Sequence, residues 1–551
     1  MNKFYEGLFV TAMVTAGAIC SQQAVAQTKK NAEAGVPAKN KIGSFISVQP
    51  TGQTSTTVIP FETHSFQLLA KSRLTTYPDG SLMPIGNDFT AFVGKNGSSK
   101  EGYLSINHEN TPGGVSILDL HLDEAQNNWV VDAVRKVDFS PLVQTTRNCS
   151  GGITPWGTVI TSEETTTRAD LNGDGYEDVG WQVEIDPVSG KIMDYDGDGK
   201  PDKLWAMGRM SHENIAISQD RRTIYQAEDG GSNGVYKFVA DEEGNLSEGK
   251  LYVLKRDSET ATTGTWVQVP NTTKADRNNT YVIGRSLGTN WRNPEDIEFG
   301  PDGKMYFTTK GTGDIWRFKD NGATVSEIEA WVTRQEYEIT YNGGTQKEDW
   351  NTGIDNLTFD GEGNLWALQD GGNDNVWVIR PDHTPENPKV ELFMTTPAGS
   401  EPTGLTFSPD FKYGFISLQN ASSANATVTL DAAGNEVVFN TATTIVFARN
   451  QFLGKNGKGP KSQVSANLTA YPNPFVNNSQ VKVNMPTDAD AVLEVYNMKG
   501  LKVATLAQGL LKKGEHTFSF NPGTTANDII YLVRLKVAGQ EISTRIIRAE
   551  N

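Results

Sequence analysis

The chain has 551 residues, of which 66 are acidic and 49 basic, so its formal charge at pH 7 is −17. Hydrophobic residues make up 37% of it, and the 54 Gly and 24 Pro are near the ordinary level, which excludes a disordered or collagen-like chain. The negative charge would repel a phosphate backbone, so we expect no nucleic-acid partner. With only 6 His, any metal chemistry should depend mainly on carboxylates.

The first 26 residues read as a signal peptide. Lys3 gives a positive start, residues 7–19 are apolar, and Ala24-Val25-Ala26 has the small-x-small pattern of a cleavage site before Gln27. We therefore expect a protein that is secreted or held at the cell surface. The sequence after residue 26 has no run of 18 consecutive apolar residues, so we predict no transmembrane segment.

Removal of the signal peptide would leave Cys149 as the single cysteine. A lone thiol is often a small buried hydrophobe. Cys149, however, lies in a glycine-rich turn, residues 147–158, that leads into a predicted strand, where the backbone can approach a ligand closely. The alternative interpretation is a thiolate that binds a transition metal.

Two Asp-rich loops follow, each with the pattern D-x-[DN]-x-D-G-x-x-D. Oxygen ligands at alternate positions around a tight Gly turn suit calcium. Trp181 and Trp205 stand where an EF-hand would have its last Glu, so we predict structural calcium loops and no helix-loop-helix switch. The alternative is a pair of simple Asp/Gly turns. The expected ligands are Asp170, Asn172, Asp174 and Asp178 in the first loop and Asp194, Asp196, Asp198 and Asp202 in the second.

The middle of the chain repeats one short pattern. Each copy begins near an acidic residue, runs into an alternating strand, turns and continues into a second strand. Unequal spacing between copies fits four-stranded blades with insertions, the pattern of a β-propeller. Segments 102–109 and 157–164 resemble the second strand of the unit, so we predict six blades. The four full copies lie at 211–217, 293–299, 353–359 and 400–407.

Equivalent positions of successive blades converge on one central channel. The acids of the four copies are therefore expected to face it: Glu213, Glu295, Asp355 and Glu401. Such close like charges would repel one another unless cations neutralise them, which predicts a multi-metal centre. The alternative is a set of blade-end carboxylates that face water. Further acids end the second strands: Glu109, Glu163, Glu164, Glu228 and Asp229.

Together these residues resemble a known family. The run 148–158, continued to Glu163-Glu164, with Ser211-His212-Glu213 and Pro294-Glu295-Asp296, is similar to the PhoX-type bacterial alkaline phosphatases over about residues 60–450. The resemblance implies a six-bladed propeller that holds two iron ions (Fe) with a bridging oxygen and three calcium ions (Ca). It also implies hydrolysis of small-molecule phosphate monoesters.

Carried over by position, the resemblance implies a catalytic centre of three residues, Cys149 as an iron ligand with Glu213 and Glu295 as carboxylate ligands. It makes Glu163, Glu164 and Glu228 candidates for iron or calcium. Family members often carry an arginine two positions before the Pro-Glu glutamate, where this chain has Asn293. Arg292 and Lys310 are the candidate phosphate-binding residues that remain, and the alternative for both is a solvated surface cation.

A separate module ends the chain. After the basic stretch 454–467, read as a linker between a propeller over 27–453 and this module, short alternating strands follow over 468–551. Tyr471-Pro472-Asn473-Pro474-Phe475 and the strands after it resemble the C-terminal sorting domain of the type IX secretion system. That resemblance implies an immunoglobulin-like β-sandwich and the secretion machinery as a partner, with export across the outer membrane. A generic adhesive sandwich is the alternative.

The sequence thus predicts an all-β protein, a six-bladed β-propeller followed by a small C-terminal immunoglobulin-like β-sandwich. A metal-dependent phosphatase is the first functional hypothesis. The second is a calcium-stabilised extracellular propeller that binds a ligand without turnover. A third, a propeller lactonase, would need carboxylate-bound calcium but no thiolate, and Cys149 disfavours it.

Overall fold

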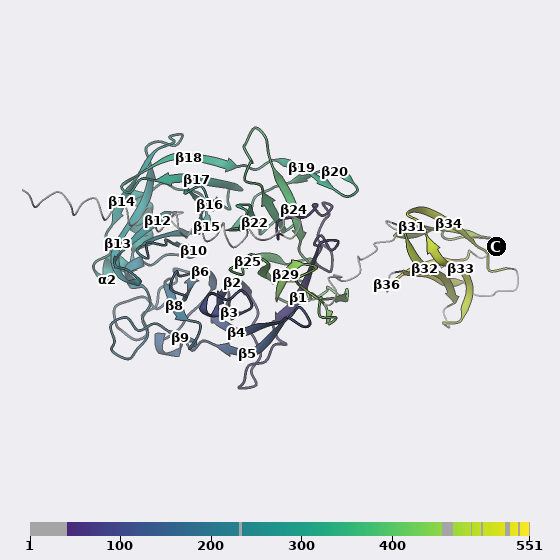
Figure 1. Cartoon of the computed structure of the whole chain (residues 1–551), viewed down its shortest axis with the longest axis horizontal. Coiled ribbons are helices and arrows are strands. Elements are labelled where there is room, and N and C mark those ends of the chain that lie inside the picture. The colour runs from purple at the N-terminus through teal and green to yellow at the C-terminus, as the bar shows by residue number, and fades with distance from the viewer. Residues whose placement is uncertain are drawn as a thin grey trace, which may run out of the picture. The chain divides into compact units, whose positions relative to one another are not determined.

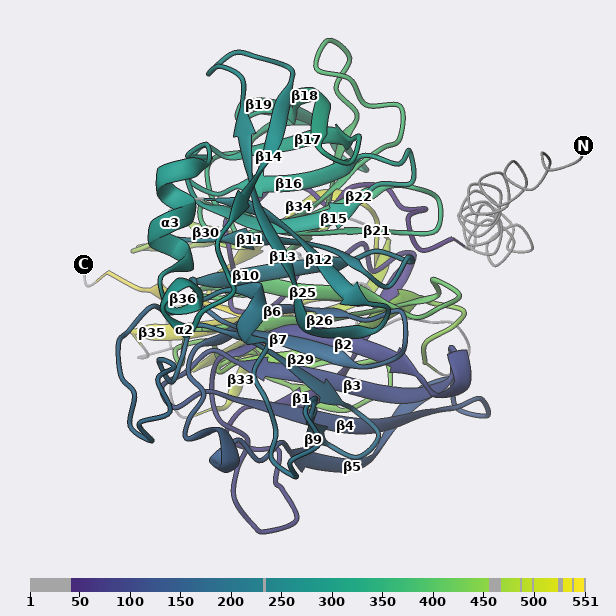
Figure 2. The ribbon, with the colours of Figure 1, turned by 90° about the vertical axis from the view of Figure 1, so that its left-hand side faces the viewer.

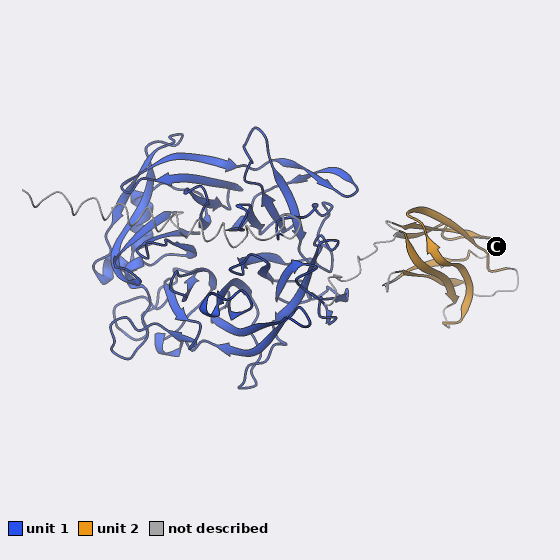
Figure 3. Cartoon of the chain, viewed as in Figure 1, with its two compact units in different colours: residues 1–459 blue, residues 460–551 orange. Residues whose placement is uncertain are grey.

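The computed structural model describes residues 41–230, 234–454, 467–485, 488–497, 500–523, 529–537 and 540–549. The chain divides into two compact units, Met1–Gly459 and Pro460–Asn551, which Figure 3 colours separately. The predicted signal peptide lies outside the described residues, as does nearly all of the predicted linker. No helix in the described part is long and apolar enough to cross a membrane.

The first unit consists of six four-stranded antiparallel blades, confirming the propeller prediction. Figure 1 shows strands β2 to β5 following one another from the centre to the rim. From the inner strand outward, the blades are β2 (Asn87–Gly94), β3 (Glu101–His108), β4 (Gly114–Asp123) and β5 (Asn128–Lys136); β6 (Asn148–Ile153), β7 (Val159–Glu163), β8 (Gln182–Asp186) and β9 (Lys191–Ile192); β10 (His212–Ile217), β11 (Thr223–Glu228), β12 (Val235–Glu242) and β13 (Asn245–Arg256); β15 (Pro294–Phe299), β16 (Met305–Thr309), β17 (Asp314–Asp320) and β18 (Thr324–Val332); β21 (Ile354–Phe359), β22 (Leu365–Gln369), β23 (Asn375–Ile379) and β24 (Val390–Thr395); β25 (Glu401–Phe407), β26 (Tyr413–Gln419), β29 (Thr443–Arg449) and β1 (His64–Lys71).

The inner strands form a closed ring. In order, β2, β6, β10, β15, β21 and β25 each contact the next, and β25 contacts β2. Strand β1, from the start of the described chain, pairs antiparallel with β29 and so completes the last blade. Because the two ends of the propeller sequence share one sheet, the ring is held shut by backbone hydrogen bonds.

Aromatic and aliphatic side chains fill the seams between blades. Phe92 of β2 stacks on Phe415 of β26 with 4.5 Å between ring centroids, and Trp366 of β22 packs against Phe447 of β29. All four side chains are buried. Close packing of this kind fixes each blade against its neighbours, so residues at equivalent ends of the inner strands keep fixed positions relative to one another.

The propeller unit also contains a few smaller elements outside its four-stranded blades. Strand β14 (Gly264–Val269) links the third and fourth blades into one sheet. Thr273 caps the helix α2 (Lys274–Asn278) with a capping box. Figure 2 shows α2 and α3 at the side of this sheet, where α3 contacts β13 and β14. The remaining elements are α2 (Lys274–Asn278), α3 (Thr280–Leu287), the hairpins β19 (Glu336–Tyr341) with β20 (Gly344–Asp349) and β27 (Thr429–Leu430) with β28 (Glu436–Val437), and the 3₁₀ turns η2 (Lys95–Gly97), η3 (Ser140–Leu142) and η4 (Trp205–Met207).

The second unit is the predicted β-sandwich. Alternate side chains of its two sheets, including Val483 of one and Leu493 and Val533 of the other, pack in a single apolar core. Met498 and Lys499, part of the sorting-domain resemblance, lie outside the described residues. One sheet is β30 (Asn467–Tyr471), β31 (Ser479–Met485) and β34 (Gly514–Phe520); the other is β33 (Lys502–Leu511), β32 (Ala489–Asn497), β35 (Ile530–Val537) and β36 (Gln540–Ile547).

Candidate metal centre

Five of the six inner strands contain a β-bulge directly after their first paired residue. In β6, for example, Asn148 pairs with Glu163, and the next pair in the ladder is Gly151 with Thr161. A bulge re-aims the side chain of the extra residue. The second residue of each bulged strand is a metal-ligand type in every case. These residues, called here the inner ring, are Asp88, Cys149, Glu213, Glu295 and Asp355.

A second set of side chains surrounds the inner ring. Each member directly follows the second strand of its blade and donates its backbone N–H to the carbonyl of the residue that precedes the inner strand. The same backbone geometry is therefore repeated five times. The members of this outer ring are Glu109, Glu164, Asp229, Lys310 and Asp370.

The two rings bring one thiol and several carboxylates together. Cys149 Sγ lies 3.5 Å from Asp88 Oδ2 and 3.5 Å from Glu213 Oε2. Potential ligand atoms lie within 4.8 Å of one another in three overlapping groups, which form one continuous cluster. The groups are Asp88, Glu109 and Cys149; Cys149, Glu164 and Glu213; and Glu213, Asp229 and Glu295.

The electrostatics of the cluster are unfavourable in the absence of cations. Burial, followed by the charge of Glu109, raises the pKa of Asp88 well above its usual range, and burial with the charge of Glu295 does the same to the pKa of Glu213. The Oε1 atom of Glu295 is buried without a hydrogen-bond partner. A buried carboxylate oxygen that accepts no hydrogen bond and lies beside other acids fits a metal ion as a partner.

Two cationic side chains of the described part of the chain border this cluster. Lys310 Nζ lies 2.8 Å from Asp355 and 2.8 Å from Asp370, and Glu295 is 3.9 Å away. The charges of these three acids raise the pKa of Lys310 against the opposing effect of burial. Lys310 therefore offsets part of the negative charge of these three acids. The other cation, Arg147, forms ion pairs with Glu109 and Glu164.

Two predicted ligands turn away from the cluster. Glu163 is fully buried, and its carboxylate forms an ion pair with Lys203. Glu228 is also fully buried and accepts a hydrogen bond from Tyr236. Both residues end a second strand, one position before the outer-ring residue. Because side chains alternate along a strand, this one-residue step directs them to the opposite face, and their expected role as ligands is not supported.

The expected equivalence of Glu401 with the other acids is wrong. In the last blade the bulge falls after Thr403, so Gly404 holds the inner-ring position and Glu401 lies three residues before it. A Cβ at Gly404 would come within 2.3 Å of the Thr90 backbone, which leaves no room for an acid there. Burial and the neighbouring Asp370 raise the pKa of Glu401 to about 10.

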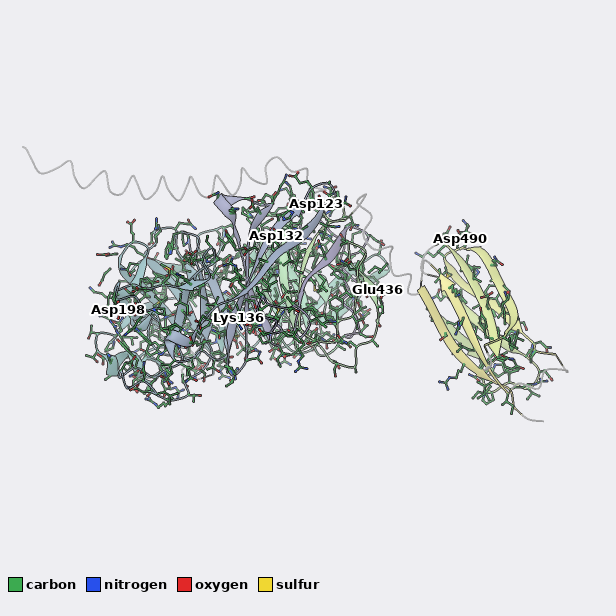
Figure 4. All side chains as sticks on the ribbon, turned by 90° about the horizontal axis from the view of Figure 1, so that it is seen from below. Asp123, Asp132, Lys136, Asp198, Glu436 and Asp490 are labelled. Carbon is green, nitrogen blue, oxygen red and sulfur yellow. The ribbon has the colours of Figure 1, made fainter. Side chains whose placement is uncertain are left out.

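The two Asp-rich loops lie away from the channel. They close in the same way: the first Asp accepts from the N–H of the second loop glycine, with Asp170 bonded to Gly175 and Asp194 to Gly199. In the second loop, oxygens of three acids also lie within 4.8 Å of one another. Figure 4 shows Asp198 at the outer edge of the propeller. The three acids are Asp194, Asp196 and Asp202.

Arg292 does not join the cluster. It lines a separate cavity of about 400 Å³ together with Arg256, Ser258, Glu259, Thr289 and Asn290. Its neighbour Asn293 instead donates a hydrogen bond to Asp229.

Sequence reasoning missed Asp88 and Asp370 and gave Arg147 no role. Asp88 follows Asn87 as Cys149 follows Asn148, but one such pair carries no recognisable signal. Asp370 follows a strand as Glu164 and Asp229 do. An alignment of the strand ends among blades could have found it.

Comparisons with known proteins agree with the propeller fold. The family model described as alkaline phosphatase PhoX matches residues 124–422, more than half of the chain. Among solved structures, Pseudomonas fluorescens PhoX in complex with vanadate, a transition state analogue, is similar with a TM-score of 0.58 and 20% identity, covering 76% of this chain and 99% of that one. No curated protein sequence matches.

More distant propellers are also similar. A streptogramin B lyase has a TM-score of 0.36 and 11% identity, covering 71% of this chain and 99% of its own. A putative 6-phosphogluconolactonase from Bacteroides uniformis has a TM-score of 0.35 and 12% identity, with coverages of 70% and 99%. These values are too low to bear on the function of this chain.

Proposed function

Because the chain belongs to the alkaline phosphatase PhoX family, we propose that it is a metal-dependent phosphatase that hydrolyses small-molecule phosphate monoesters in its propeller channel. One observation carries this proposal beyond family membership: five blades present a thiol or a carboxylate at the same bulge. The repetition of blades does not by itself require metal-ligand side chains at these bulges. A multi-metal centre does require them.

The donor set fits iron and calcium. Cys149, Glu213 and Glu295 would hold two iron ions with a bridging oxygen, since a thiolate selects a transition metal. Asp88, Glu109, Glu164 and Asp229 would complete the shells or hold calcium, which prefers carboxylate oxygens. Bound ions would also offset the burial and the repulsion that raise the pKa values of Asp88 and Glu213.

The reaction would transfer a phosphoryl group to water. The ester P–O bond breaks, a new P–O bond forms to the water oxygen, and a water proton passes to the departing alcohol. The ions, when bound, would offset the charge on the phosphoryl oxygens and lower the pKa of water. The protein's own residues would fix the geometry, because the bulged strands hold the ligand side chains on a closed ring.

We further propose that the two Asp-rich loops bind structural calcium. Their matching closure supports the prediction, with Asp178 accepting from Leu171 N–H and Asp202 from Tyr195 N–H, each joining the two ends of its loop. A cation held only by the folded loops would stabilise the propeller.

We also keep secretion as a proposal. The sequence of the first 26 residues and the resemblance of residues 468–551 to a type IX sorting domain support export to the cell surface or beyond. Mass spectrometry of the mature protein from culture medium would test both: the proposal expects an N-terminus at Gln27. A cell-associated chain that keeps residues 1–26 would contradict it.

The phosphatase proposal is tested by hydrolysis of an aryl phosphate with iron-replete protein and added calcium. Wild type should turn over, and Glu213→Gln should lose at least about a hundredfold in kcat, the scale typical of removing one group that stabilises the transition state. Asp132→Asn, at an exposed site on β5 that Figure 4 labels, is the matched control and should keep full activity. Absence of turnover in metal-loaded wild type would overturn the proposal.

A further inference from the structure

The residues that directly precede the inner strands form a third set of equivalent positions. Each accepts the backbone N–H of an outer-ring residue at its carbonyl oxygen, so all five have the same place beside the cluster. Arg147 holds this place in the second blade and Asn293 in the fourth. The five residues are Gly86, Arg147, Ser211, Asn293 and Gly353, and Arg147 is their one cation.

The backbone fixes Arg147 firmly in this place. Its N–H donates to Asn110 O at 2.7 Å, and its carbonyl accepts from Glu164 N–H at 2.9 Å. Its φ of 48° lies in the left-handed region, as does that of Asn293 at 61°. Two backbone hydrogen bonds hold a conformation that an arginine rarely adopts, and this aims the side chain at the cluster.

Some N–H groups of the Arg147 guanidinium are not used in hydrogen bonds within the described residues. Nη2 lies 2.8 Å from Glu109 and also pairs with Glu164, one acid from each of the two ligand groups that contain Cys149. Within the described residues, Nε and Nη1 have no hydrogen-bond partner, and the side chain is 46% exposed. Arg147 therefore combines a fixed position beside the ligands with free N–H groups open to solvent.

The other nearby cations lack this combination. Lys310 is held by Asp355 and Asp370 at 2.8 Å each. Arg292 lines a cavity whose lining includes no residue of the inner or the outer ring. A phosphate dianion that approaches a channel rich in carboxylates needs a positive charge with unused donors, and an arginine suits phosphate better than a lysine.

We propose that Arg147 is the residue of this chain that contacts the phosphoryl oxygens of the substrate, donating from Nε and Nη1 while Nη2 stays with Glu109 and Glu164. This inference rests on the proposed phosphatase function and deepens it. Because Nε and Nη1 add charge-assisted N–H donors beside the phosphoryl group, Arg147 favours dianionic phosphate monoesters over monoanionic diesters.

Two variants and a matched control test the proposal. Arg147→Gln should weaken binding of inorganic phosphate to the metal-loaded protein at least tenfold, measured by calorimetry, and lower kcat/KM for an aryl phosphate about a hundredfold. Arg147→Lys should recover part of the phosphate affinity. Arg292→Gln, one residue from Asn293, should match wild type in both measurements. The monoester-to-diester ratio of kcat/KM should fall in Arg147→Gln.

Metal content and thermal stability separate phosphate contact from a purely structural role. Iron and calcium per chain should be unchanged in Arg147→Gln. Wild-type phosphate affinity in this variant, or a loss that simply follows a loss of metal, would overturn the inference. Wild-type protein that binds phosphate through Arg147 without turnover would overturn only the phosphatase function, whereas absence of phosphate binding by metal-loaded wild type would overturn both.

Discussion

The side chains of Glu163 and Lys203 form an ion pair of 2.6 Å with no solvent exposure of either side chain. Lys203 Nζ also donates to Asp178 O at 2.6 Å, and Glu163 accepts from the backbone N–H of Gly180 at 2.9 Å. The pair thus ties β7 to the segment that follows the first Asp-rich loop. The neighbouring Glu164 belongs to the cluster instead.

Adjacent glutamates should therefore give opposite phenotypes. Glu163→Gln leaves a buried ammonium without its counter-ion, so we expect a loss of about 3–5 kcal/mol in the free energy of unfolding, measured by urea denaturation of chelator-treated protein. Glu164→Gln should change that stability little but reduce bound metal. A Glu163→Gln protein as stable as wild type, or one that loses metal while Glu164→Gln keeps it, would contradict this assignment.

Cys149→Ala should lose iron while the propeller stays folded. The thiol is the one soft donor in the cluster, and replacing it removes a ligand without introducing a charge. Elemental analysis, with circular dichroism as the folding control, measures both effects. Asp88→Asn, at the equivalent bulge of the first blade, is the companion variant and should lower metal content less. Full iron content in Cys149→Ala would exclude the thiolate as a ligand.

Calcium removal should lower the melting temperature through the Asp-rich loops. We expect EGTA to shift wild type by several degrees, because loss of a ligand bound only to the folded state destabilises that state. Asp194→Asn combined with Asp202→Asn should start lower and respond less to EGTA, since both acids belong to the loop group. If the double variant responds to EGTA as wild type does, the loops are simple turns.

His64 makes the stability depend on pH. Burial, with a smaller contribution from Arg449, lowers its pKa to about 3, and both ring nitrogens are hydrogen-bonded, to Thr63 and Ile42 O. The unfolded chain takes up the proton near pH 6.5, whereas the folded chain does so only near pH 3. The stabilising contribution is therefore complete above about pH 6.5 and is lost as the pH falls toward 3.

Between pH 7 and pH 5 this histidine should account for about 2 kcal/mol of lost stability. Denaturation midpoints of wild type and His64→Gln at several pH values give the difference directly. The variant should be less stable at pH 7 but should lose less on acidification. Parallel pH curves for the two proteins would show that His64 does not titrate as described.

The propeller could be predicted because its repeat has a strong signal, an acid followed by two alternating strands separated by a turn. The contribution of β1 to the last blade could not, since strand pairing over the whole propeller depends on ring closure and leaves no local pattern. The positions of the β-bulges could not be predicted from the sequence either. A one-residue shift decides whether Glu163 or Glu164 faces the channel, and sequence alone placed both there.

The candidate site was predicted in part for the same reason. Cys149, Glu213 and Glu295 lie in the cluster because their motif fixes their register. Glu401 was misplaced, since the acid of the last copy precedes the bulge by three residues. Asp88 escaped notice because its blade shares too little sequence with the others.

The most direct test of the central claim is the metal content of purified mature protein, measured beside hydrolysis of an aryl phosphate with calcium present. We expect iron near two per chain, as a two-metal centre requires, together with calcium and turnover. Calcium alone, with no iron and no turnover after growth in iron-rich medium, would contradict it and favour a binding propeller without catalysis.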